Sequence, residues 1–182
     1  MALPPVAEAI TRALPPAASA RTVETVGPFD QLIVFDGDNR RARSRVAVAL
    51  IDAAHPTSIW VVGMGWLVED MSEKGVPRSS IHHYGGAPTT FEQVRFLRDL
   101  MARAPEHRTV VIVSTLQAPR TEGLLLAAGV KVTLVASPID EEPASMGLRH
   151  YLPSYLALRL SRDAIYEHVA LWYYRKQGRI LH

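Results

Sequence analysis

From Gln31 onward, short apolar runs alternate with stretches whose apolar residues recur at helical spacing. The runs are rich in Val and Ile and end in Gly, Ser, Thr or Asp, which predicts strands near residues 31–36, 58–63, 79–83, 109–114 and 130–136. Continuously apolar strands separated by amphipathic helices are typical of a parallel sheet that helices cover on both faces. The pattern therefore predicts an α/β fold: a three-layer αβα sandwich with a Rossmann-like, doubly wound parallel sheet of about five strands and C-terminal helices.

The first 28 residues have a different character. They are rich in Ala and Pro, and Val6, Ile10 and Leu14 fall at helical spacing. We expect a short helix followed by an extended linker over residues 1–28, with a partly ordered tail as the alternative. Residues 29–182 form the predicted domain.

After the fifth predicted strand the pattern is helical only. Ser161 is a candidate N-cap, and Gly178 marks the end of the helix. Between them, Ile165, Val169 and Trp172 form one apolar stripe, which predicts that this face packs on the domain.

Composition narrows the function classes. The 182 residues suit one domain, and 20 Lys and Arg against 18 Asp and Glu give a net charge of +2, too small for a broad nucleic-acid surface. Cysteine is absent, which excludes disulfides, thiolate nucleophiles and cysteine-based zinc sites. Neither a secretory signal nor an apolar run of membrane-spanning length is visible, so we expect a cytoplasmic protein without membrane insertion.

The candidate site residues follow from the topology. In open parallel sheets, ligands bind beyond the carboxyl ends of the strands, where helix N-termini carry positive partial charge. The predicted ligand-binding residues are the polar side chains and glycines that follow the predicted strands: Asp36, Gly37, Asp38, Asn39, Arg43, Gly63, Gly65, Thr89, Thr90, Glu92, Ser114, Thr115, Gln117 and Arg120.

Asp36 and Asp38 suggest a metal-dependent alternative. A turn through Gly37 could direct both carboxylates to one Mg²⁺ ion, as hard cations require. The same Asp-x-Asp opens haloacid dehalogenase-like phosphatases, and Asp-Gly-Asp-Asn resembles the start of some PIN-like nucleases. Ordinary turn chemistry explains these residues equally well.

Two pairs of side chains indicate an anionic ligand. Thr89 and Thr90 precede a predicted helix, so their hydroxyls either cap it or also contact a ligand, while Glu92 favours its first turn. Arg43 and Arg120 suit bidentate binding of phosphate or carboxylate, although surface salt bridges are the alternative.

Several separated segments, in order, resemble the YdcF/SanA/ElyC family over roughly residues 30–180. They are Gly75-Val76-Pro77 with Ile81, then Thr90-Phe91-Glu92-Gln93, then Val113-Ser114-Thr115 with Arg120 and Gly129, and finally residues 161–180 with Glu167, Tyr174 and Gly178. The chain departs from the family at three turns, with Asp36-Gly37-Asp38 after the first strand, Gly63-Met64-Gly65 after the second, and Gln117 where a histidine is usual.

The resemblance implies a Rossmann-like fold, a polar cleft and a link to bacterial envelope homeostasis. One branch of the family binds S-adenosylmethionine, which makes a ligand of that kind one candidate. We therefore expect a small-molecule-binding domain for a phosphate-bearing or nucleotide-like ligand. A divalent-metal phosphohydrolase using Asp36 and Asp38, and a non-catalytic regulatory or scaffold domain, are the alternatives.

Overall fold

The computed structural model describes residues 3–37, 39–139 and 152–180. Its centre is a five-stranded sheet in which every neighbouring pair is parallel, in the order β3-β2-β1-β4-β5. The strands are β1 (Gln31–Phe35), β2 (Ser58–Val62), β3 (Ile81–Tyr84), β4 (Thr109–Ser114) and β5 (Thr133–Ser137). The predicted α/β sandwich is confirmed. The strand order changes direction between β1 and β4, because β2 and β3 lie on one side of β1 and β4 and β5 lie on the other.

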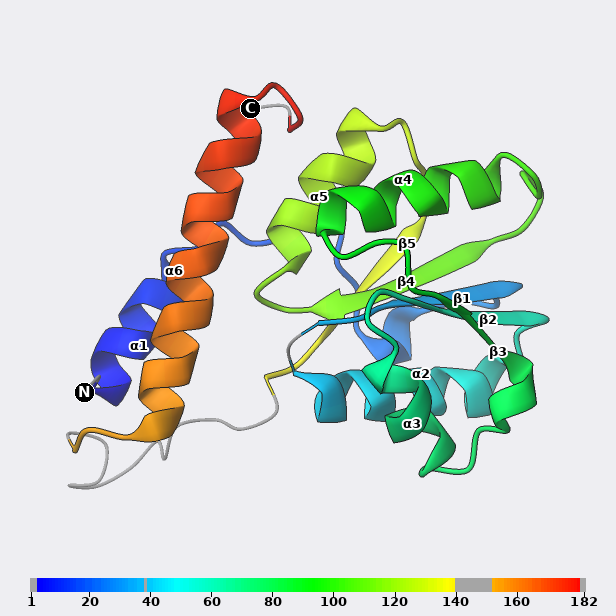
Figure 1. The fold of residues 1–182 in the computed structure, drawn as a ribbon, viewed down its shortest axis with the longest axis horizontal. Helices are drawn as coiled ribbons and strands as arrows, with labels where there is room; N and C mark the ends of the chain where they lie inside the picture. Colours follow the sequence, from blue (N-terminus) through cyan, green and yellow to red (C-terminus); the bar gives the residue numbers. More distant parts are fainter. Residues whose placement is uncertain (1–2, 38, 140–151, 181–182) are drawn as a thin grey trace.

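Helices cover both faces of this sheet (Figure 1). One face carries α2 (Arg40–Ala54) and α3 (Trp66–Ser72), and the other carries α4 (Thr90–Met101) and α5 (Ala118–Ala127). Two short 3-10 helices, η1 (Val23–Thr25) and η2 (Arg78–Ser80), lie in the connections. None of the helices in the described part of the chain has the length and apolar character needed to cross a bilayer.

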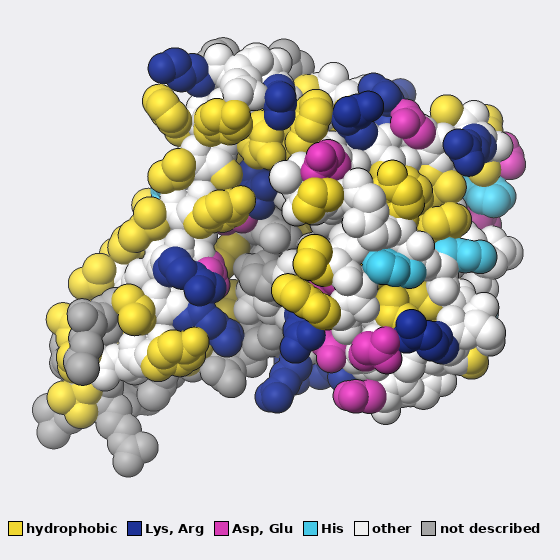
Figure 2. Space-filling model, in the orientation of Figure 1, with side chains coloured by type: hydrophobic (Ala, Val, Ile, Leu, Met, Phe, Trp, Pro, Cys, Tyr) yellow, Lys and Arg dark blue, Asp and Glu magenta, His cyan; other side chains and the backbone are white. Residues whose placement is uncertain are grey.

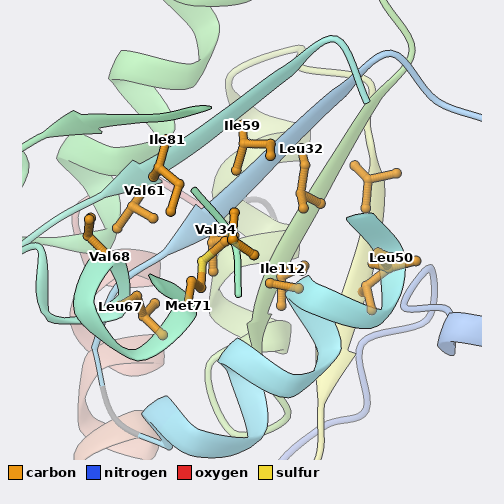
Figure 3. Packing of buried hydrophobic residues seen from close by; sticks show 14 of the residues in the cluster. Leu32, Val34, Leu50, Ile59, Val61, Leu67, Val68, Met71, Ile81 and Ile112 are labelled. Carbon is orange, nitrogen blue, oxygen red and sulfur yellow. The ribbon is translucent and has the colours of Figure 1, made fainter. Parts of the chain in front are cut away.

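The sheet divides the apolar core into two layers because successive side chains of a strand point to opposite faces. Leu32 and Val34 of β1 pack with Met71 under the sheet, on the side of α2 and α3 (Figure 3). Ile33 and Phe35 pack on the side of α4 and α5. All of β1 is buried, as expected for a central strand, so its continuously apolar pattern reports burial on both faces.

The long helix α6 (Tyr155–Lys176) stands at one side of the sandwich, with α1 (Pro4–Arg12) packed along it (Figure 1). It begins at Ser154, whose hydroxyl accepts a hydrogen bond from the Ala157 N–H at 3.0 Å. The predicted N-cap at Ser161 is wrong, because the helix already runs through that buried residue.

The predicted burial of the Ile165–Val169–Trp172 stripe is also wrong. All three side chains are at least half exposed. The helix instead buries the opposite side, which includes Ala164 and Leu171. Apolar spacing identified an apolar face correctly but could not say which neighbour, if any, covers it.

Candidate functional site

The β1 carboxyl end is organised around Asp36. Its side chain is buried, with Oδ1 accepting the Gly37 N–H at 2.8 Å and Oδ2 accepting the Trp66 N–H at 2.9 Å. Trp66 is the first residue of α3, so one carboxylate ties the turn after β1 to the start of the helix after β2. Gly63 permits this approach, since its φ is 133° and an added Cβ would lie 2.8 Å from the Asp36 Cβ.

Arg43 joins this turn to the loop after β4. Its guanidinium is fully buried and donates from Nη1 to the Phe35 carbonyl and from Nη2 to Gln117 Oε1 at 3.2 Å. Gly37 leaves room between these groups, because an added Cβ would lie 3.0 Å from Gln117 Nε2. Gln117 thus holds a buried cation.

Gln93 of α4 connects the ends of β1 and β2. Its Nε2 donates to the carbonyl oxygens of Asp36 at 3.3 Å and of Val62 at 3.1 Å. A buried carbonyl without a partner costs about 1–3 kcal/mol, so this amide stabilises the end of β1; the Val62 carbonyl also accepts the Asp36 N–H. Gln93 was not among the predicted site residues, although it closes the segment Thr90-Phe91-Glu92-Gln93.

A buried ion pair joins α5 to α6. Arg120 donates from Nε to Glu167 Oε2 and from Nη2 to Glu167 Oε1, both at 2.7 Å, and from Nη1 to Thr90 Oγ1, also at 2.7 Å. Both charged side chains are only 4% exposed, so the surface salt bridge considered for Arg120 is wrong. Burial alone lowers the pKa of Arg120, but the hydrogen bonds and charge of Glu167 raise it above its ordinary value.

Other predicted residues make hydrogen bonds within the fold. Thr89 and Glu92 form a capping box at the start of α4. Thr115 donates from Oγ1 to the Ser137 carbonyl at 2.7 Å. Ser114, which is buried, accepts the Gln117 N–H at 3.3 Å.

A polar cavity of about 220 Å³ opens beside these groups, between the start of α5 and α6. It is lined by Gln117, Asp163, Tyr166 and Glu167. The Tyr166 ring is 62% exposed and lies 5.7 Å from the Arg120 guanidinium carbon. The N-terminal end of the ten-residue helix α5 adds positive partial charge next to Gln117. Neither Asp163 nor Tyr166 was predicted, because their positions in a helical segment gave no sign of this cavity.

A larger groove, of about 500 Å³, follows the β3 edge of the sheet and is a separate feature. Trp60, Tyr84 and Phe96 form its aromatic floor. Glu92 is the one predicted site residue in its wall, and that side chain is occupied in the capping box.

The predicted residues therefore form two buried clusters at one edge of the sheet. Asp36, Arg43 and Gln117 surround the ends of β1 and β4, while Thr90 and Arg120 join Glu167. Gln117 and Glu167 share the cavity, which brings the clusters together. Two further predicted residues lie in turns: Gly65 and Asn39 have left-handed backbone conformations and precede α3 and α2 respectively. Asp38 lies outside the described residues.

The metal hypothesis stays a prediction, because Asp38 lies outside the described residues. Among the residues that are described, no group of three or more His, Asp or Glu side chains converges. Both oxygens of Asp36 accept backbone N–H groups, so this carboxylate already has a structural role.

Comparisons with known protein families, with curated proteins and with solved structures find no match to this chain.

Proposed function

We propose that this domain binds a small phosphate-bearing or nucleotide-like molecule at the carboxyl ends of β1 and β4, in the cavity between α5 and α6. The observation that carries the proposal is the polar lining of that cavity, where Gln117 and Glu167 are held by hydrogen bonds from the buried side chains of Arg43 and Arg120. A buried ion pair contributes little net stability compared with apolar packing. Its position beside a cavity therefore favours a role in holding a binding surface rigid.

The charges of this wall indicate how an anion would be held. Glu167 offsets Arg120, and Asp163 accepts from Arg162 at 2.6 Å, so neither carboxylate is an unbalanced charge facing the cavity. The anionic group of the ligand would lie against the positively polarised N-terminal end of α5 and the side chain of Gln117. Arg120 would act mainly by fixing Thr90 and Glu167.

Tyr166 supports the nucleotide-like part of the proposal. Its exposed ring borders the cavity, and aromatic rings stack on nucleobases with little regard to base identity. Adenine nucleotides and S-adenosylmethionine share this chemistry. A place in the YdcF/SanA/ElyC family and in bacterial envelope homeostasis is part of the proposal and rests on the sequence resemblance alone.

Native mass spectrometry of freshly purified protein tests the proposal by detecting a retained ligand, and calorimetric titration with ADP, S-adenosylmethionine and inorganic phosphate tests its class. We expect Tyr166→Ala to weaken nucleotide binding about fivefold or more, from the loss of about 1–3 kcal/mol of stacking. Tyr84→Ala, in the β3 groove, is the matched control and should bind as the wild type does. Equal affinity in both variants would contradict the proposed location.

The metal-dependent alternative gives a different result in the same titrations. A phosphohydrolase using Asp36 and Asp38 would release phosphate only with Mg²⁺ present and would lose that activity in Asp36→Asn. Binding that is unchanged by chelator, without phosphate release, favours the binding function. A stable protein partner with no ligand in either assay favours a scaffold.

A further inference from the structure

A second cavity lies between α4, the end of α5 and the turn that follows α6, and we call it the α4–α5 groove. Its volume is about 470 Å³. Ligand sites for small molecules have volumes of about 300–1,000 Å³, so the groove is large enough to hold one. It combines an apolar floor with three arginines, and the residues that matter below are Phe91, Leu124, Ala127, Arg95, Arg98 and Arg179.

The α4–α5 groove has an excess of positive charge. No acidic side chain is among its lining residues in the described part of the chain. Arg98 pairs with the neighbouring Asp99 at 2.9 Å. Arg95 and Arg179 make no side-chain hydrogen bond or ion pair with any residue that the structure describes. Several Lys and Arg side chains lie along the top of the molecule in Figure 2, over α4 and α5. Two guanidinium groups without a counterion on an apolar floor favour an anionic ligand.

Arg179 is held in place without the use of its hydrogen-bond donors. Its guanidinium carbon lies 4.2 Å from the centre of the Phe91 ring and 5.8 Å from the centre of the Tyr174 ring. Contact with aromatic rings orients a guanidinium group and leaves its N–H groups free to donate. By contrast, the buried Arg43 and Arg120 donate to acceptors within the protein. Arg179 is therefore oriented in advance for bidentate hydrogen bonds to a carboxylate or phosphate group.

The end of α5 does not account for these arginines. Cations often bind the last carbonyl groups of a helix, where the partial charge is negative. In α5 the carbonyls of residues 124–126 already accept backbone N–H groups of residues 128–130, at 2.9–3.1 Å. Gly129, with a φ of 68°, allows the chain to fold back in this way. The guanidinium groups are thus not required as caps and are left for a ligand.

We propose that the α4–α5 groove binds a small organic anion in which one carboxylate or phosphate group is joined to an apolar body. The anionic group lies against Arg95 and Arg179, and the apolar body lies on Leu124 and Ala127. This site is separate from the cavity between α5 and α6, because the two lie at opposite ends of the ten-residue helix α5, about 15 Å apart. The proposal does not depend on the function proposed for that cavity.

Amide NMR titration of the ¹⁵N-labelled full chain tests the location and the class of ligand. The probes are octanoate and octyl phosphate, which distinguish a carboxylate from a phosphate ligand, with octanol as the uncharged control, all below their micelle concentrations. We expect saturable shifts of the Ala127, Gly178 and Arg179 amides with at least one anion and none there with octanol. No saturable shift with either anion, equal shifts with octanol, or shifts confined to Gln117 and Tyr166 would each overturn the proposal.

Charge-removing variants test the role of the arginines with the same probes. Arg179→Gln should weaken binding about tenfold, since a hydrogen bond to a charged group is lost. Arg95 is exposed, so Arg95→Gln tests the same point with no change to the core, and it should also weaken binding. Arg103→Gln is the matched control, because this exposed arginine lines the β3 groove instead, and it should bind as the wild type does. Circular dichroism checks that each variant is folded. Unchanged affinity in Arg179→Gln and Arg95→Gln, or an equal loss in Arg103→Gln, would contradict the site.

Discussion

Removing the negative charge of Glu167 should destabilise the fold strongly, although the residue is far from the sheet centre. Glu167→Gln keeps the shape of the side chain but leaves the Arg120 charge without its counterion, with both groups 4% exposed. Breaking such a buried pair costs about 3–5 kcal/mol, and the lower value applies because glutamine retains one acceptor. In a domain of this size, about 3 kcal/mol corresponds to a fall in Tm of roughly 6–12 °C.

Urea and thermal denaturation followed by circular dichroism measure this loss. The pair Arg78–Glu69 is the matched control, because it is just as short at 2.5 Å but about 65% exposed on both side chains. Glu69→Gln should therefore change stability by less than about 1 kcal/mol. Replacing Arg120 and Glu167 together by Leu should restore much of the stability lost in Glu167→Gln. A Glu167→Gln variant as stable as Glu69→Gln would refute the energetic role assigned to the buried pair.

Three further changes have expected outcomes. Asp36→Asn leaves one acceptor for two backbone N–H donors, so urea denaturation should show a loss of about 1–3 kcal/mol, and an unchanged midpoint would show that the carboxylate does not hold the turn. Gly123→Ala, normally favourable in a helix, should destabilise the fold by about 1–3 kcal/mol because the added Cβ would lie 2.5 Å from Ile180; a raised Tm would contradict this packing. The hydrogen bonds from Arg108 lower the pKa of Asp30, so the stability difference between wild type and Asp30→Asn should be present at neutral pH and vanish as the pH falls through and below the folded-state pKa; a difference that persists in strong acid would argue against the pair.

The fold could be predicted because the sequence pattern that marks each strand lies within a few neighbouring residues. Each strand is a short apolar run that ends in a turn residue, and the buried strand β1 shows this most clearly. The start of α6 was harder to predict, since Ser154 and Ser161 both precede apolar residues at helical spacing. Only the three-dimensional structure shows which of the two begins the helix.

The location of the candidate site could be predicted from the sequence, but the contacts between its side chains could not. Parallel topology brings all strand carboxyl ends to one edge, which is why Thr90 and Arg120, distant in sequence, meet there. The partner that neutralises Arg120 is Glu167, 47 residues later, and no periodicity indicates that pairing. The same limit explains the missed cavity residues Asp163 and Tyr166, which belong to a helix whose docking the pattern did not specify.

The most direct test of the proposed binding site is a two-dimensional amide NMR titration of the ¹⁵N-labelled chain with ADP. Binding in the cavity between α5 and α6 predicts saturable shifts of the Gln117, Ala118 and Tyr166 amides. The Asp30 and Arg108 amides, at the opposite edge of the sheet, should stay unchanged. Shifts confined to the β3 groove, or none at saturating ADP, would contradict a nucleotide-like ligand at this site.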